Sequence, residues 1–163
     1  FSAFFALFYH VAFLFVFLKL KIYPLFYFNI ASVVIFVSML LSVKKVKNYL
    51  IAFLISDAEV ICHQILADYF LGGEASFHYL MLITGFLAFL IYVGNPKMSI
   101  SLSILPISLF VICEIFSPFI LPVVEISRTT LFCIKLANVS LSVIVLTFMI
   151  LILLKSLIGS QEN

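Results

Sequence analysis

Six long apolar segments, joined by short polar connections, follow one another along this chain of 163 residues. A helix needs about 20 apolar residues to cross the hydrocarbon core of a bilayer. Strands of a membrane barrel are only about 10 residues long and alternate in polarity, which these segments do not. The sequence therefore predicts an all-α, polytopic membrane protein, a six-transmembrane-helix bundle that forms a single domain over residues 1–163. The expected spans cover about residues 1–18, 24–42, 49–71, 77–94, 99–117 and 129–159.

The composition supports a lipid bilayer as the surroundings of the chain. Hydrophobic residues make up 66% of it and charged residues 10%. Soluble proteins average about 45–50% apolar and about 25% charged residues. Too few charged residues are present to cover the surface of a soluble domain of this size. These values exclude a soluble globular domain, a disordered chain and a protein that binds nucleic acid.

Lysine and arginine residues in the connections predict the orientation of the bundle. Short cytoplasmic connections of membrane proteins carry an excess of these residues. If the N-terminus is cytoplasmic, the inner side carries Lys44, Lys45, Lys47, Lys97 and Lys155. The outer side then carries Lys19, Lys21 and Arg128. The larger number on the inner side predicts that both termini lie in the cytoplasm.

Ionisable residues inside the expected spans are the main functional signal, because they are costly in lipid and usually face the interior of a bundle. Counted from the outer ends of the expected spans at 1.5 Å per residue, most of these residues are expected in the outer half of the membrane. Glu59 lies deeper, near the middle, and shares a helix face with His63 four residues later. We expect six of these residues to line an outward-facing pocket for a small ligand or ion: Glu59, His63, Asp68, His78, Glu114 and Lys135.

Structural pairing is one alternative to a ligand pocket. In that interpretation Asp68 and Glu114 neutralise Lys135 or lie at the lipid headgroups. Asn29 and Asn138 are expected to form hydrogen bonds between helices. The chain would then be a membrane anchor that senses nothing.

Cofactor binding is another alternative. Imidazole and carboxylate groups suit a divalent metal, which His63 and His78 would bind together with Glu59 or Asp68. A b-type haem is also open, because His10 and His63 have equal expected depth on two helices. The corresponding function is a haem-binding redox anchor, and a small transporter or substrate-binding membrane subunit is the remaining class. The sequence contains no catalytic motif in its connections, so enzymatic activity is left undecided.

Two stretches carry a resemblance to a known family: Glu59-Val60-Ile61-Cys62-His63 and Leu71-Gly72-Gly73-Glu74-Ala75-Ser76-Phe77-His78-Tyr79-Leu80. They resemble the six-helix membrane module that precedes the catalytic domain of many bacterial class III adenylate cyclases and GGDEF diguanylate cyclases. In that pattern the third helix carries Glu and then His. A Leu-Gly turn with an acidic residue then leads into an aromatic-rich fourth helix. A His in the first helix (here His10) and an Asn near the start of the last (here Asn138) also resemble the pattern.

The resemblance implies a sensory or regulatory role in the inner (cytoplasmic) membrane of a bacterium. It implies that a nucleotide cyclase follows Asn163 in a longer protein and that the module works as a homodimer. A ligand entering from outside would favour one arrangement of the helices. In this hypothesis His63 and His78 contact the ligand and Glu59 orients His63. The last helix then transmits the change to the cyclase.

Overall fold

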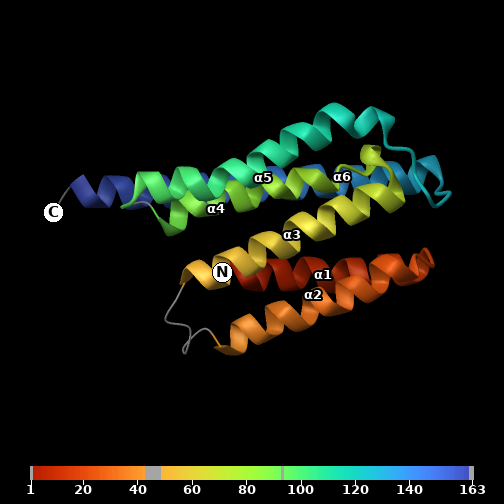
Figure 1. Ribbon diagram of the computed structural model, residues 1–163, viewed down its shortest axis with the longest axis horizontal. Coiled ribbons are helices and arrows are strands. Elements are labelled where there is room, and N and C mark those ends of the chain that lie inside the picture. The colour runs from red at the N-terminus through yellow and green to blue at the C-terminus, as the bar shows by residue number, and fades with distance from the viewer. Residues whose placement is uncertain (1, 43–48, 93, 162–163) are drawn as a thin grey trace.

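The described part of the chain folds into helices joined by short connections. The computed structural model describes residues 2–42, 49–92 and 94–161. Within these ranges it contains six α-helices, three short 3₁₀-helices and no strand (Figure 1). The α-helices are α1 (Ser2–Lys19), α2 (Tyr23–Ser42), α3 (Tyr49–Leu71), α4 (Met81–Ile91), α5 (Pro96–Phe116) and α6 (Arg128–Gln161). The 3₁₀-helices are η1 (Gly73–Ala75), η2 (Phe77–Leu80) and η3 (Ser117–Phe119). The predicted all-helical fold is confirmed, and with η2 counted as part of α4 the described helices begin and end within three residues of the expected spans.

Helix length and composition indicate a membrane protein. Within the described residues, four helices are long and apolar enough to cross a bilayer: Tyr23–Ser42, Leu50–Leu71, Pro96–Phe119 and Arg128–Lys155. The other two expected spans correspond to the shorter apolar helices Ala3–Lys19 and Phe77–Ile91. At 1.5 Å per residue, Phe77–Ile91 is about 22 Å long, which is less than the hydrocarbon thickness of about 30 Å. A six-span arrangement therefore requires the bilayer to accommodate two short helices, which it can do by local thinning.

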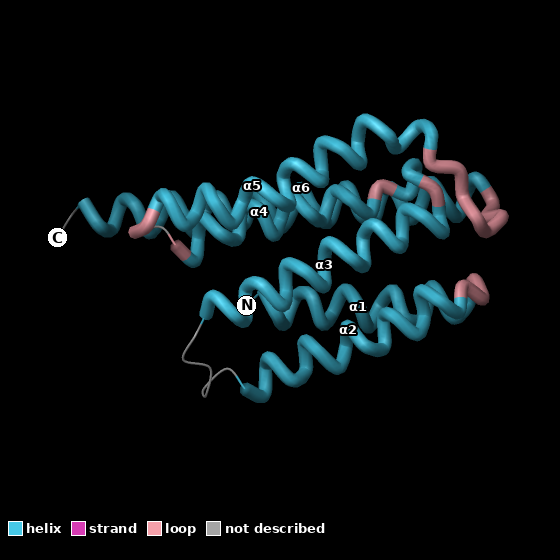
Figure 2. Tube along the Cα trace, viewed as in Figure 1, coloured by secondary structure: helices cyan, strands magenta, loops and turns pink. Residues whose placement is uncertain are grey.

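The helices run along the long axis of the molecule, and the connections lie at its two ends (Figures 1 and 2). α1 packs against α2, and α4 packs against both α5 and α6. α3 lies between these two groups and contacts α2, α4 and η2 (Figure 1). Side chains of α3 therefore reach partners in both groups, and this position makes α3 the centre of the candidate site.

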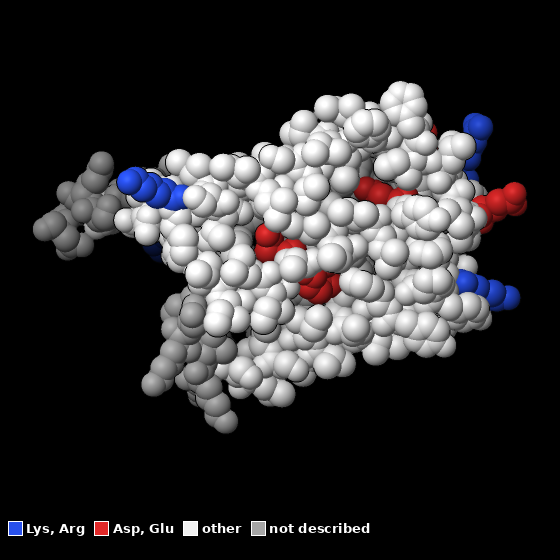
Figure 3. All heavy atoms as spheres, in the orientation of Figure 1, with Lys and Arg blue, Asp and Glu red and all other residues white. Residues whose placement is uncertain are grey.

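Apolar side chains cover much of the outside of the bundle, while many polar side chains lie inside. On α1, Phe4, Phe8 and Phe15 are exposed, whereas Phe13 and Phe17 are buried in the core. Lys and Arg atoms lie at the two ends of the molecule in the view of Figure 3, and acidic atoms appear within the apolar middle. This distribution suits a chain whose surroundings are themselves apolar, because polar groups then gain by facing one another.

The turn between α3 and α4 depends on two glycines. Gly72 has a φ of 85°, a left-handed conformation that favours glycine. A Cβ atom on Gly73 would lie 2.4 Å from the carbonyl oxygen of Ser117, so a side chain at this position would collide with η3. The Gly73 N–H donates to the carbonyl of Ile120 at 3.1 Å. These contacts fix η1 against η3, and with it the start of η2, where His78 lies.

Candidate functional site

Five polar side chains from α1, α2 and α3 meet inside the bundle, and we call them the α1–α3 network: His10, Asn29, Ser32, Glu59 and His63. His10 Nδ1 lies 2.6 Å from Asn29 Oδ1, and Asn29 Nδ2 donates to the backbone carbonyl of His10. The Ser32 hydroxyl donates to Glu59 Oε1. Each of the five residues is at most 6% exposed. The network therefore joins three helices through contacts that are closed to the surroundings.

His10 on α1 and Glu59 on α3 face each other inside the network. Because the Asn29 amide nitrogen is used by the His10 backbone, His10 Nδ1 donates to the Asn29 carbonyl oxygen. The other ring nitrogen, Nε2, lies 3.4 Å from Glu59 Oε2. Without a proton, two electron pairs would face each other there, and a proton on either group makes the contact attractive. This contact therefore links α1 to α3 within the network.

His63 is the member of the network whose ring nitrogens lie within hydrogen-bond distance of no described group, although the Gln64 side chain is close to it. The residue is fully buried, and neither ring nitrogen has a hydrogen-bond partner among the described residues. Its ring packs edge to face on His10, with a centroid distance of 4.7 Å and an interplanar angle of 88°. A buried polar group without a partner costs about 1–3 kcal/mol. The ring nitrogens of His63 therefore lower the stability of the fold, because no described group forms a hydrogen bond that would offset their burial.

The contact between the two histidine rings bears on the haem hypothesis. A haem held by two imidazoles lies between them, so the macrocycle separates the rings. The His10 and His63 rings instead touch each other, and His10 Nδ1 is already used by Asn29. As arranged here, this pair of residues does not fit a b-type haem.

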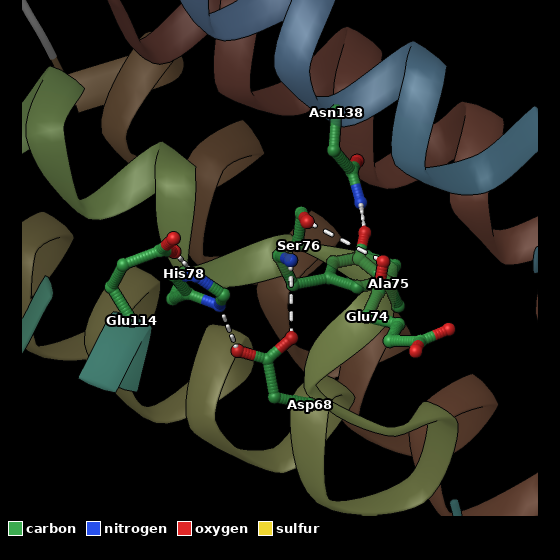
Figure 4. A network of polar contacts seen from close by, with 8 residues as sticks. Asp68, Glu74, Ala75, Ser76, His78, Glu114 and Asn138 are labelled. Carbon is green, nitrogen blue, oxygen red and sulfur yellow. Dashed lines mark hydrogen bonds and ion pairs between the residues drawn. The ribbon is translucent and has the colours of Figure 1, made fainter. Parts of the chain in front are cut away.

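A second cluster, which we call the Asp68 triad, consists of Asp68 on α3, His78 on η2 and Glu114 on α5 (Figure 4). His78 Nδ1 lies 2.6 Å from Asp68 Oδ2, and His78 Nε2 lies 2.8 Å from Glu114 Oε2. Asp68 Oδ1 also accepts a hydrogen bond from the Phe77 N–H at 3.1 Å. The side chain of His78 is completely buried, whereas that of Glu114 is 50% exposed. The triad is thus fully paired at its centre and open at one end.

Both nitrogens of His78 are used within the triad. Ionised carboxylates only accept hydrogen bonds, so an imidazole that donates to both of them carries two protons and a positive charge. Such a ring balances part of the acidic charge inside apolar helices. A metal ion would compete for the same nitrogens. In the part of the chain that the structure describes, no group of three His, Cys, Asp or Glu residues could hold a metal ion. The residues therefore fit an ion-pair triad and do not fit a metal centre.

The structure divides the six residues that the sequence places in one pocket. Two of them lie in the α1–α3 network and three in the Asp68 triad. The sixth, Lys135 on α6, is exposed, and the described ion pairs do not include one between Lys135 and Asp68 or Glu114. The expected metal ligands are divided in the same way, with Glu59 and His63 in the network and the other two in the triad. Among the described residues, the expected ion pair between Lys135 and Asp68 or Glu114 is therefore not formed.

Uncharged polar side chains are the part of the site that sequence reasoning only partly anticipated. The expected interhelical hydrogen bonds of Asn29 and Asn138 are confirmed. Ser32 and Gln64 were not expected to take part, although both are buried. A signal was present for Ser32, because it lies three residues after Asn29 and so shares its helix face. Gln64 has no comparable signal beyond its place in an apolar span.

Asn138 connects α6 to the surroundings of both clusters. The Tyr9 hydroxyl donates to Asn138 Oδ1 at 3.1 Å, and Asn138 Nδ2 donates to the carbonyl of Ala75 at 2.9 Å (Figure 4). Tyr9 precedes His10 of the network, and Ala75 lies in η1, three residues before His78 of the triad. Asn138 thus joins α6 to residues that adjoin the two clusters in the sequence.

Comparisons with known proteins add no identification. The chain matches no protein-family model, none of the curated proteins and no solved structure.

Proposed function

We propose that the chain is the membrane-embedded regulatory domain of a bacterial nucleotide cyclase. In this proposal all six helices cross the inner membrane, both termini lie in the cytoplasm, and two copies form a homodimer. A small ligand or ion changes the packing of α1, α3 and η2, and α6 passes the change to the cyclase. The motif resemblance supports the cyclase as the output, and the buried polar clusters support the sensing role.

The observation that carries the proposal is the position of Asn138. This one side chain on α6 is bonded to Tyr9 and to the Ala75 carbonyl, which adjoin the network and the triad respectively. A ligand does work only through a difference in affinity between two arrangements. A rearrangement of α1 against η1 would break or distort one of the two Asn138 hydrogen bonds. The state of the polar clusters would thereby bias the position of α6.

The length of α6 supports its role as the output. It contains 34 residues and is about 51 Å long at 1.5 Å per residue. The hydrocarbon core of a bilayer is about 30 Å thick. A helix of this length extends beyond the membrane, so a change at Asn138 is carried outside the lipid on a continuous helix.

The test measures cyclic-nucleotide synthesis by the whole natural protein in membrane vesicles, with ATP and GTP supplied separately. We compare Asn138→Ala and Tyr9→Phe with Ser140→Ala, a matched control at an exposed position of α6. A hydrogen bond contributes about 1 kcal/mol, which corresponds to a shift of about fivefold in a two-state equilibrium. We expect both variants to change kcat by about this factor while the KM for the nucleotide stays constant.

Each result decides a separate part of the proposal. If neither ATP nor GTP gives a cyclic nucleotide, the proposed cyclase output is wrong. The proposed coupling through α6 is wrong if kcat is the same in Tyr9→Phe, in Asn138→Ala and in the Ser140→Ala control. Tyr9→Phe is included because it deletes a single hydroxyl and leaves the aromatic packing on Phe13 in place.

A further inference from the structure

A cavity of about 140 Å³ lies between the helices on the α1 side of α6. Its walls come from five helices, with Ala6 on α1, Gln64 on α3, Leu87 on α4 and Met149 on α6 among the lining residues. Most of the lining is apolar. An engineered apolar cavity of about 150 Å³ in a soluble protein binds benzene. The space between these helices therefore matches a molecule built on a single small ring or a chain of similar size.

The polar atoms around the cavity leave one acceptor open. Gln64 is 1% exposed, and its side chain lies close to His63, but its Oε1 atom is within hydrogen-bond distance of no described group. The other polar side chains of the lining are already engaged. The Tyr9 hydroxyl donates to Asn138, and the Thr84 hydroxyl donates to the carbonyl of Met81. His10 and Ser56 likewise have polar contacts, with Asn29 and with the Met39 sulfur respectively.

An open acceptor in an apolar cavity selects a particular chemistry. A buried carbonyl oxygen without a partner costs free energy that a hydrogen-bond donor on the occupant recovers. A charged occupant would have to leave its hydration shell without an opposite charge among the lining side chains, which is unfavourable. The matching molecule is neutral, is largely apolar and carries one O–H or N–H donor. Such a molecule also dissolves in the bilayer that surrounds the helices.

The cavity is in contact with the output helix. Val145, Met149 and Ile152 of α6 form part of its wall, within four turns of Asn138 on the same helix. An occupant would therefore touch α1, α3 and α6 together. We propose that this cavity is the ligand site of the chain and that it binds a small neutral amphiphile whose O–H or N–H group donates to Gln64 Oε1. The regulatory meaning of the site rests on the proposed function, whereas the binding itself does not.

The test uses two fluorinated probes of nearly equal size, 4-fluorophenol and 4-fluorotoluene, which differ in one O–H group. Their binding to the chain in lipid nanodiscs is followed by ¹⁹F NMR, with protein-free nanodiscs as the reference for partition into lipid. We expect 4-fluorophenol to bind about tenfold more tightly than 4-fluorotoluene. In Gln64→Leu the two probes should bind with dissociation constants within twofold of each other, because the acceptor is gone while the side chain keeps a similar size.

Two further variants keep the test decisive. Ser101→Leu removes a polar side chain at an exposed position of α5 and should leave the tenfold ratio intact. Ala6→Leu adds volume inside the cavity and should weaken both probes together. A ratio near one in the unaltered chain would overturn the proposal, as would a ratio that Gln64→Leu does not change.

The result separates this site from the proposed function. If 4-fluorophenol binds as expected and leaves the cyclic-nucleotide output of the whole protein unchanged, the cavity stands as a binding site and the sensor function fails. If the Asn138 and Tyr9 variants change the output while neither probe binds, the sensor function stands and the cavity assignment fails.

Discussion

The two polar clusters of this protein use the same residue types in opposite ways. In the Asp68 triad both nitrogens of His78 face carboxylates, and one acid reaches the surroundings. In the α1–α3 network the acid is buried, and His63 has no polar partner among the described residues. One cluster has satisfied its hydrogen-bonding groups, whereas the other has kept some open.

This difference separates a structural role from a functional one. A satisfied cluster inside apolar helices holds the fold together, because removing one partner leaves a buried group unpaired. An unsatisfied buried group lowers the free energy of unfolding, so stability does not explain why it is present. We therefore expect the Asp68 triad to contribute mainly to stability, and the network with the adjoining Gln64 to supply the contacts to a ligand.

The same substitution at the two histidines gives the largest contrast. His78→Leu leaves Asp68 buried and unpaired, and breaking a buried pair costs about 3–5 kcal/mol. His63→Leu removes only unpartnered nitrogens, so it should raise the free energy of unfolding by about 1 kcal/mol. Unfolding by SDS in mixed micelles, followed by circular dichroism, measures both values. Equal losses at the two positions would show that His63 has a polar partner and would end the distinction between the clusters.

The turn that supports the triad offers a test of intermediate size. Gly73→Ala places a methyl group 2.4 Å from the Ser117 carbonyl oxygen, and such overpacking costs about 1–3 kcal/mol. Gly94→Ala is the matched control, because no described atom lies within 4 Å of a Cβ atom there. The measurement is the shift in SDS unfolding midpoint of each variant. A midpoint for Gly73→Ala that equals the Gly94→Ala value would mean that η1 is free to move away from η3.

The smallest expected effect tests the open end of the triad. Glu114→Gln keeps the shape of the side chain and removes its charge from a position that is 50% exposed. Partly exposed ion pairs contribute about 0–1 kcal/mol, so the free energy of unfolding should fall by no more than that. The same SDS titration measures it. A loss as large as that of His78→Leu would place Glu114 among the essential members of the triad.

The helices could be predicted because the length of an apolar run fixes the element that it forms. An apolar run of about 20 residues fits the bilayer only as a helix, and the polar connections mark where each helix ends. The hydrogen bonds of Asn29 and Asn138 were also predictable, since an amide inside an apolar span needs a partner.

The grouping of the ionisable residues could not be predicted in full, because position along a helix gives depth and not direction. Glu114 and Lys135 are both expected in the outer half of the membrane, yet Glu114 meets His78 while Lys135 is exposed. Which face of a helix points inward is set by packing against its neighbours. The separation of His63 from His78 likewise depends on η2, a 3₁₀ segment that places His78 against α5 and away from the network.

The position of Asn138 on α6 has a mechanical consequence. From Asn138 to the last described helical residue, Gln161, the helix continues without interruption, a distance of about 35 Å at 1.5 Å per residue. If α6 tilted as one rigid helix about Asn138, a tilt of about 5° would move its far end by about 3 Å, given this rise per residue. A tilt of that size inside the bundle would thus become a displacement at the end of α6 as large as a hydrogen bond is long.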